Sequence, residues 1–153
     1  MALDHGVLSF LPLLTDTDWK VPVVPLAVNV IQHPLPTARR CYRLGQALRA
    51  AVESFPGDSK VVVMGTGGMS HQLQGKRFGF MNEKFDQWFM DELERDPKGL
   101  SDITHQKIME DAGAEAVELI MWLTMRGAAH GKRVHRHYYA PMTTGMGLIT
   151  FEG

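Results

Sequence analysis

The chain has 153 residues, of which 44% are hydrophobic and 22% are charged, and its 16 basic and 17 acidic side chains leave a formal net charge of −1. This composition is typical of one globular domain and excludes a collagen-like, disordered or disulfide-rich chain. The balanced charge gives no overall attraction to nucleic acid or to an anionic membrane, and a single cysteine without a long apolar run favours a cytoplasmic protein.

The amino-terminal third predicts a strand, a loop and a helix in that order. The apolar run over residues 21–30 is typical of a buried strand, and its prolines at positions 22 and 25 place it near a sheet edge. A loop over residues 31–36 leads to a helix that begins at Thr37, because apolar residues recur from there to Phe55 at spacings of three and four.

A second short apolar run, Lys60–Met64, is rich in β-branched residues and predicts another strand. It leads directly into a glycine-rich segment, residues 65–71, which we call the glycine loop. The order strand, helix, strand predicts a βαβ unit. The predicted fold class is therefore α/β, with a mixed, mainly parallel sheet flanked by helices, in a single or partial domain over residues 1–153.

The second half of the chain predicts three helices and a last strand. Asn82 and Thr104 are typical caps of the first two helices, and Gly113 is placed to end the second in a left-handed turn. The third helix is expected over residues 115–129 and the strand over residues 147–151. Three histidines between these two elements match no structural zinc spacing and are expected to be polar loop residues; they are His130, His135 and His137.

His71, at the end of the glycine loop, is the first residue that predicts chemistry. The glycines at positions 65, 67 and 68 fit neither of the common phosphate-binding patterns, so a nucleotide site is not expected. A loop that leaves the carboxyl end of a parallel strand is where ligands bind in open α/β sheets. Histidine is the side chain most often used for proton transfer, so His71 is a candidate acid or base.

Glu118 is the second such residue, because its helical neighbours are apolar. An unpaired carboxylate costs several kcal/mol to bury, so it needs a metal, a proton or a cation as its partner. A metal or catalytic role and a structural ion pair with Arg126 or Arg136 both satisfy this requirement. The neighbours at helical spacing are Ala114, Met121, Trp122 and Met125.

Several separated motifs resemble one enzyme family. In order along the chain they are Leu3-Asp-His-Gly6, Gly65-Thr-Gly-Gly-Met-Ser-His-Gln-Leu-Gln-Gly75, Asn82, Glu118-Leu-Ile-Met-Trp-Leu-Thr-Met-Arg-Gly-Ala128 and His135-Arg-His-Tyr138. Together they resemble the class III extradiol ring-cleaving dioxygenases, the family of the protocatechuate 4,5-dioxygenase β subunit and of gallate dioxygenases. The resemblance covers nearly the whole chain and matches the carboxyl-terminal half of a full-length member.

The resemblance implies a non-haem Fe(II) cofactor that is held by two histidines and one glutamate, and the glutamate matches Glu118. It implies that His71 is the base that helps to deprotonate a catechol, and that His5 is a second catalytic histidine acting as an acid. Such a site cleaves the ring of a protocatechuate- or gallate-like aromatic acid with O2, as part of aromatic compound degradation. Two open iron positions would bring the diol and O2 together.

The chain also departs from the family pattern. The two iron-binding histidines belong to the family's amino-terminal half, so this chain alone is expected to bind iron weakly and to be inactive. Where relatives carry Ser-Asn for the substrate carboxylate, this chain has Thr143 and Thr144, which leaves the identity of the catechol open. These two residues and Ser70 are the predicted substrate contacts.

The resemblance further implies a homo- or hetero-oligomer with a small α subunit or with the amino-terminal half, and no nucleic-acid or membrane partner. Two other functions stay open at this point. One is a non-catalytic interaction module, in which His71 and Glu118 are relics. The other is an acid/base catalyst that uses His71 and Glu118 without iron.

Overall fold

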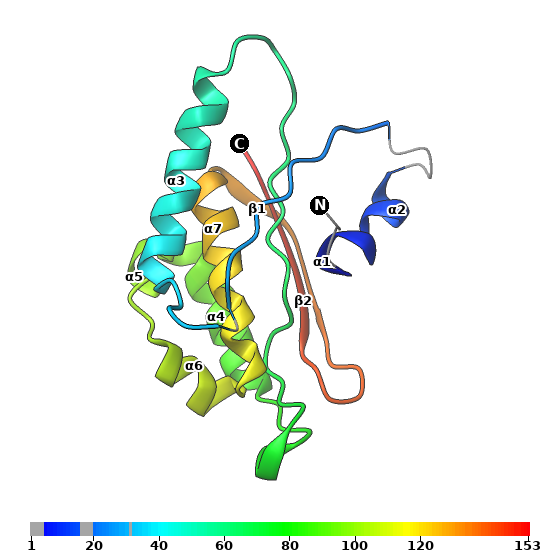
Figure 1. Ribbon diagram of the computed structural model, residues 1–153, viewed down its shortest axis with the longest axis vertical. Coiled ribbons are helices and arrows are strands. Elements are labelled where there is room, and N and C mark those ends of the chain that lie inside the picture. Colours follow the sequence, from blue (N-terminus) through cyan, green and yellow to red (C-terminus); the bar gives the residue numbers. More distant parts are fainter. Residues whose placement is uncertain (1–4, 16–19, 31) are drawn as a thin grey trace.

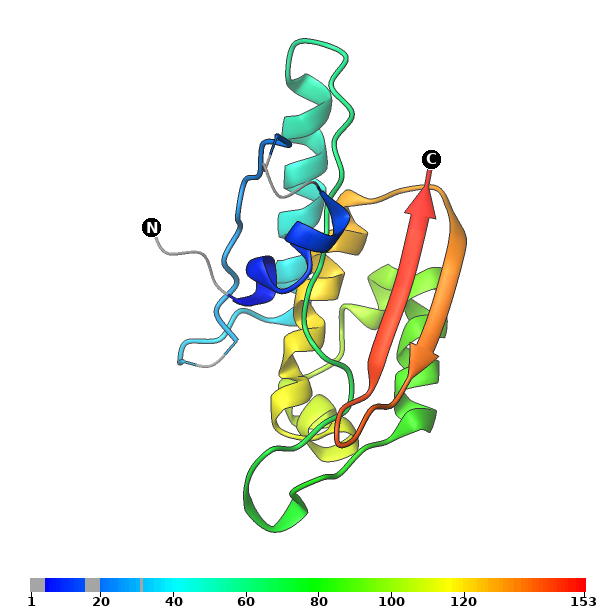
Figure 2. The same cartoon turned by 90° about the vertical axis from the view of Figure 1, so that its right-hand side faces the viewer.

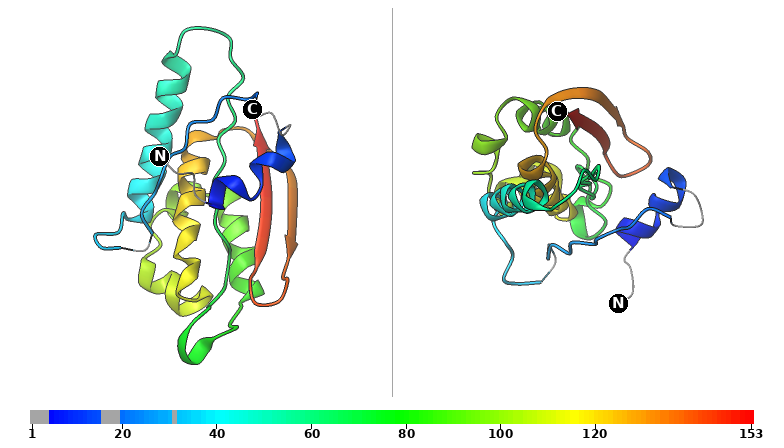
Figure 3. Two further views of the ribbon diagram at one scale, coloured as in Figure 1. Left: turned by 45° about the vertical axis from the view of Figure 1, so that its right-hand side comes forward. Right: turned by 90° about the horizontal axis from the view of Figure 1, so that it is seen from above.

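The computed structural model describes residues 5–15, 20–30 and 32–153. Helices form one layer, and a β-hairpin covers it on one side (Figures 1 and 2). Two short amino-terminal helices lie apart from the other helices (Figure 3). In chain order the elements are α1 (His5–Leu8), α2 (Leu11–Leu14), α3 (Ala38–Ser54), η1 (Gly75–Arg77), α4 (Glu83–Arg95), α5 (Pro97–Leu100), α6 (His105–Ala112), η2 (Glu115–Leu119), α7 (Ile120–Ala128), β1 (Lys132–Tyr139) and β2 (Met146–Glu152).

The predicted helix start at Thr37 and the predicted caps Asn82 and Thr104 are confirmed. The Thr37 side chain accepts a hydrogen bond from the Arg40 N–H at the start of α3. Asn82 and Thr104 cap α4 and α6 in the same way, each accepting from a backbone N–H three residues later. These bonds satisfy amide groups that have no partner within the helix. Gly113 ends α6 with a φ of 104°, as expected for a glycine at a helix end.

Helices α3 and α7 pack against each other so closely that their backbones touch. A Cβ atom on Gly45 of α3 would lie 2.0 Å from the Thr124 carbonyl oxygen of α7. A Cβ atom on Gly127 of α7 would lie 2.2 Å from the Tyr42 carbonyl oxygen of α3. Both glycines are therefore required by contact between the two helices, not by a special backbone conformation.

This crossing predicts the sign of a stability change. Helix propensity alone would make Gly45→Ala stabilising by about 1 kcal/mol. Because the added methyl group meets backbone atoms that cannot turn away, we expect instead a loss of about 2 kcal/mol in the free energy of unfolding. Urea denaturation of the two proteins measures this difference, and an increase in stability would contradict the close crossing.

The hydrophobic core lies between α3, α4, α6, η2 and α7. Phe89 and Leu93 of α4 are fully buried, as are Leu119, Ile120 and Leu123. The side chains of Arg49 and Arg126 both bond to the Ala129 carbonyl oxygen just after α7, where cations are favourable for a helix. No helix within the described ranges is both long and apolar enough to cross a membrane.

The predicted mainly parallel sheet is not confirmed. The sheet formed by the described residues has two antiparallel strands, β1 and β2, which pair from Lys132 with Glu152 to Tyr139 with Met146 and contain an irregularity between Arg133 and His135. The predicted strands at 21–30 and 60–64 run as open chain in their described residues. Strand pairing depends on a neighbour, which an apolar sequence pattern does not reveal.

The prediction of a polar loop around the histidines is wrong for two of the three. His135 and His137 lie in β1, opposite Thr150 and Leu148 of β2. The adjacent residue Arg136 turns the other way, to the carboxylate of Asp91 and the side chain of Gln87 on α4. Arg133 likewise bonds to Glu94 of α4. Polar contacts of this kind hold the hairpin on α4.

Candidate active site

Backbone hydrogen bonds hold the end of the glycine loop on two sides. On the hairpin side, the Met69 N–H donates to the Gly145 carbonyl over 2.9 Å and the Gly145 N–H donates to the Ser70 carbonyl over 2.8 Å. On the helix side, the His71 N–H donates to the Ala112 carbonyl at the end of α6. This segment of the loop is therefore fixed by elements that lie far away in the sequence.

Glu118 meets the middle of the glycine loop. It lies in η2, directly before α7, and its Oε2 accepts a hydrogen bond of 2.8 Å from the Gly68 N–H. The loop approaches so closely that a Cβ atom on Gly67 would lie 2.7 Å from the Cβ of Glu118. Gly67 also has a φ of +116°, which glycine adopts without strain. The loop thus fixes the direction of a partly buried carboxylate.

His71 and Thr144 lie on another side of Gly68. A Cβ atom on Gly68 would be 3.0 Å from His71 Cε1 and 3.2 Å from Thr144 Cγ2. The backbones of His71 and Thr144 form an isolated antiparallel bridge. The structure therefore brings together three of the residues that the sequence predicted for the site, Glu118, His71 and Thr144, around one glycine.

The ring of His71 has a defined orientation. Its Nδ1 lies 2.8 Å from the carbonyl oxygen of Met69. A carbonyl oxygen only accepts, so Nδ1 carries the hydrogen of this bond and Nε2 is left as the nitrogen that can accept a proton. The ring is buried and its backbone is held on both sides, which suits a group that must transfer a proton at a fixed position.

A buried carboxylate that the sequence analysis missed, Asp86, organises the loop next to His71. Asp86 Oδ1 accepts from the Ser70 N–H over 2.8 Å, and Oδ2 accepts from the Ser70 hydroxyl over 2.6 Å. The Tyr138 hydroxyl of β1 also donates to Oδ2, over 2.9 Å. Three donors on one carboxylate join α4, the glycine loop and the hairpin. The signal was present, because Asp86 precedes the buried residues Phe89, Met90 and Leu93 by three, four and seven positions.

The environment of Asp86 predicts a pH dependence. Burial raises the pKa of Asp86 above its ordinary value, although the hydrogen bonds from Ser70 oppose this effect. Between the ordinary and the raised pKa, the folded state binds more protons than the unfolded state, so Asp86 favours folding more as the pH falls. We expect the stability of the wild type relative to Asp86→Asn to increase as the pH falls from neutrality through this range.

Urea denaturation of both proteins across the pH range tests this expectation. Asp91→Asn, on the exposed side of the same helix, is the control for loss of an α4 carboxylate. If the free energy of unfolding of the wild type decreases relative to that of Asp86→Asn as the pH falls, the assigned direction is wrong.

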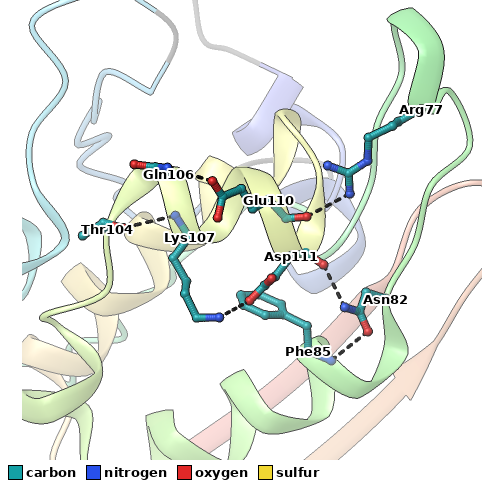
Figure 4. A network of polar contacts seen from close by, with 8 residues as sticks. All are labelled: Arg77, Asn82, Phe85, Thr104, Gln106, Lys107, Glu110 and Asp111. Atoms are coloured by element: carbon teal, nitrogen blue, oxygen red, sulfur yellow. Dashed lines mark hydrogen bonds and ion pairs between the residues drawn. The ribbon is translucent and has the colours of Figure 1, made fainter.

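Asn82 fastens the same region to α6. Its Nδ2 donates to the Asp111 carbonyl over 2.8 Å while its Oδ1 caps α4, and Arg77 reaches the Glu110 carbonyl nearby (Figure 4). The Asn82 N–H donates to the Ser70 hydroxyl, which therefore accepts one hydrogen bond and donates another. Ser70 has no exposed surface, so a contact with substrate would require this network to rearrange.

The described residues do not by themselves form a metal site. No three His, Cys, Asp or Glu side chains in residues 5–15, 20–30 and 32–153 are grouped to hold an ion. Glu118 provides one oriented carboxylate, while a facial iron triad needs two histidines in addition. The part of the chain that the structure describes therefore provides one of the three ligands of such a site.

The other predicted residues lie as follows. Thr143 is in the turn between β1 and β2, beside Gly79. His5 begins α1, which together with α2 lies apart from the other helices (Figure 3). Asp4 lies outside the described residues. Neither arginine considered as an ion-pair partner of Glu118 serves that purpose, because Arg126 bonds to carbonyl groups and Arg136 pairs with Asp91. The structural ion-pair alternative for Glu118 is thus not supported.

Comparisons with known proteins show which family the chain resembles. Residues 1–149 match the family described as the catalytic LigB subunit of aromatic ring-opening dioxygenase. A gallate dioxygenase of Pseudomonas putida is 47% identical over 98% of this chain and 45% of its own length. A 2,3-dihydroxyphenylpropionate/2,3-dihydroxicinnamic acid 1,2-dioxygenase of Xanthobacter autotrophicus is 25% identical over 99% of this chain and 64% of its own length. The chain thus spans less than two thirds of the length of these relatives.

Proposed function

The chain belongs to the LigB family of aromatic ring-opening dioxygenases, and from this premise we propose that it supplies the carboxyl-terminal half of an extradiol active site. The observation that carries the proposal is the grouping of Glu118, His71 and Thr144 around Gly68. A metal-binding carboxylate, a base and a substrate contact are the parts that such a half site requires.

We propose Glu118 as one of three protein ligands of a non-haem Fe(II), with two histidines supplied by the amino-terminal half that the longer relatives have. Bound Fe(II) would bring a chelating diol and O2 together. The contribution of this chain is to orient the carboxylate, because the Gly68 N–H holds one oxygen and leaves the other to face a ligand. Such fixed orientation of a ligand by its outer partners is general in metal sites.

We propose His71 as the base that takes a proton from a catechol hydroxyl. Because Nδ1 is bonded to the Met69 carbonyl, the proton is accepted at Nε2. The backbone bonds to Ala112 and Gly145 and the Asp86 network keep the ring in place while it is charged. His5 remains the proposed second histidine, which would act as an acid when the amino-terminal half is in place.

We propose that the substrate is a catechol-type aromatic acid, with gallate tested first because of the relative at 47% identity. Thr144, beside His71, and Thr143 are the proposed contacts to its polar substituents. A small α subunit is a further proposed partner.

Oxygen consumption tests the proposed function. The chain would be loaded anaerobically with Fe(II), alone and mixed with the separately expressed amino-terminal part of the Pseudomonas putida gallate dioxygenase. Oxygen uptake would then be recorded with gallate and with protocatechuate. We expect uptake only in the mixture. Well-folded samples that bind no iron and consume no oxygen in either case would overturn the proposal and favour a non-catalytic interaction module.

A further inference from the structure

The segment over residues 60–66 has the surroundings of a central strand but lacks its neighbours. It runs between α7 and β2 (Figures 1 and 2). Among the described residues, none from 60 to 66 donates or accepts a backbone hydrogen bond. The segment contains no proline, so each of its seven N–H groups is able to pair. Unpaired backbone of this kind is a ready template for another strand.

One face of this segment is already covered at residues 63 and 65. Val63 packs against the hydrophobic core, and the backbone at Gly65 is so close to α7 that a Cβ atom there would lie 2.9 Å from Met125 Cβ. The alternate residues Val62 and Met64 are exposed, Val62 at 73%. Val61 is exposed as well, at 52%, so covered and uncovered residues alternate from Val62 to Gly65. Such alternation is the pattern of a β-strand with a helix on one face only.

The segment over residues 21–28 repeats the features in a weaker form. It makes no backbone hydrogen bonds among the described residues, and Val24 is 92% exposed. Its prolines at positions 22 and 25 remove one donor from each edge. It therefore suits an outer position of a sheet, whereas residues 60–66 suit an inner one.

We propose that residues 60–66 are a docking strand, completed by β-strands and an apolar cover from the amino-terminal part of a LigB-family dioxygenase. The identity of this partner rests on the proposed function. The proposal holds whether or not the partner is covalently joined to this chain. The argument for this occupant is the length of the relatives, because this chain at 98% coverage accounts for 45% of the gallate dioxygenase. The remaining polypeptide is large enough to provide both strands and helices.

Hydrogen exchange tests the docking strand directly. The amino-terminal part of the Pseudomonas putida gallate dioxygenase, expressed separately, is added to this chain without iron or substrate. We expect the amides of residues 60–66 to exchange rapidly in the chain alone and about 100-fold more slowly in the mixture, because backbone pairing protects amides from exchange. Binding without protection of these amides would overturn the proposal, as would an absence of binding.

A matched pair of variants locates the interface. Val62→Asp places an unpaired charge in the proposed contact and is expected to weaken binding about 100-fold. Phe78→Asp changes a side chain of similar exposure, 68%, at η1 beyond the other end of the glycine loop, and is expected to bind as the wild type does. Because both side chains are exposed, neither substitution should unfold the chain, which circular dichroism verifies.

The outcomes separate this proposal from the proposed function. Protection and binding without oxygen uptake would support the docking strand and overturn the dioxygenase activity. Protection that grows with the concentration of this chain alone would identify a second copy as the occupant and overturn the docking strand as proposed.

Discussion

Oxygen uptake by the assembled dioxygenase, the proposed combination of this chain with the separately expressed amino-terminal part, is expected to fall below detection when Glu118 is replaced by glutamine. The substitution removes one of three proposed iron ligands and its negative charge, while the amide oxygen can still accept the Gly68 N–H. The Fe(II) affinity should decrease by more than the roughly 10- to 100-fold associated with loss of an outer-shell partner. Anaerobic equilibrium dialysis measures this affinity without reference to turnover.

Glu115→Gln is the matched control for this experiment. Glu115 lies three residues earlier in the same helical turn, and it also accepts a backbone hydrogen bond, from the Leu73 N–H. Its replacement removes the same charge but no proposed ligand, so iron affinity and oxygen uptake should stay near the wild-type values. Retention of iron by Glu118→Gln would assign the carboxylate to the structural support of the glycine loop instead.

Helix ends could be predicted from this sequence because their determinants are local. The capping side chains Thr37, Asn82 and Thr104 bond to amides only three residues away, and Gly113 meets a local conformational need. The candidate site residues Glu118 and His71 could also be predicted from the sequence. Glu118 was indicated by its apolar helical neighbours and His71 by its loop motif. Each signal lies within about a dozen residues of the chain.

The sheet could not be predicted in the same way because its determinants are distant. The inner face of β1 carries Arg133, Arg136 and Tyr138, which bond to carboxylates of α4 some forty to fifty residues earlier. Such a strand lacks the apolar alternation of a typical half-buried one. Residues 60–66 have the opposite character, an apolar pattern without a partner. Pattern and pairing are thus separate properties in this chain.

Asp86 shows why part of the candidate site was missed. An acidic residue near a helix start is usually explained by the helix dipole, so its sequence position alone attracts no attention. Its importance arises from two hydrogen bonds to Ser70 and one to Tyr138, which meet only in the folded structure.

Replacing His71 with alanine is expected to lower kcat of the assembled dioxygenase by about 10²- to 10⁴-fold, the usual contribution of a positioned acid or base. Iron content should be unchanged, because the imidazole is not among the proposed ligands. The KM for the aromatic acid should change much less than kcat, since the proton transfer and not substrate binding is lost. Steady-state oxygen uptake together with iron analysis separates these quantities.

Rescue by imidazole distinguishes a catalytic role of His71 from a merely structural one. The His71 backbone bonds to Ala112 and pairs with Thr144, and alanine retains both of these interactions, so the loop should keep its position. Added imidazole should then restore part of the activity of His71→Ala by taking the place of the missing ring. His137→Ala, in which an exposed ring of β1 is removed, should neither lose activity nor respond to imidazole. Loss of iron or of folding in His71→Ala, without rescue, would show that the ring supports the loop and is not the base.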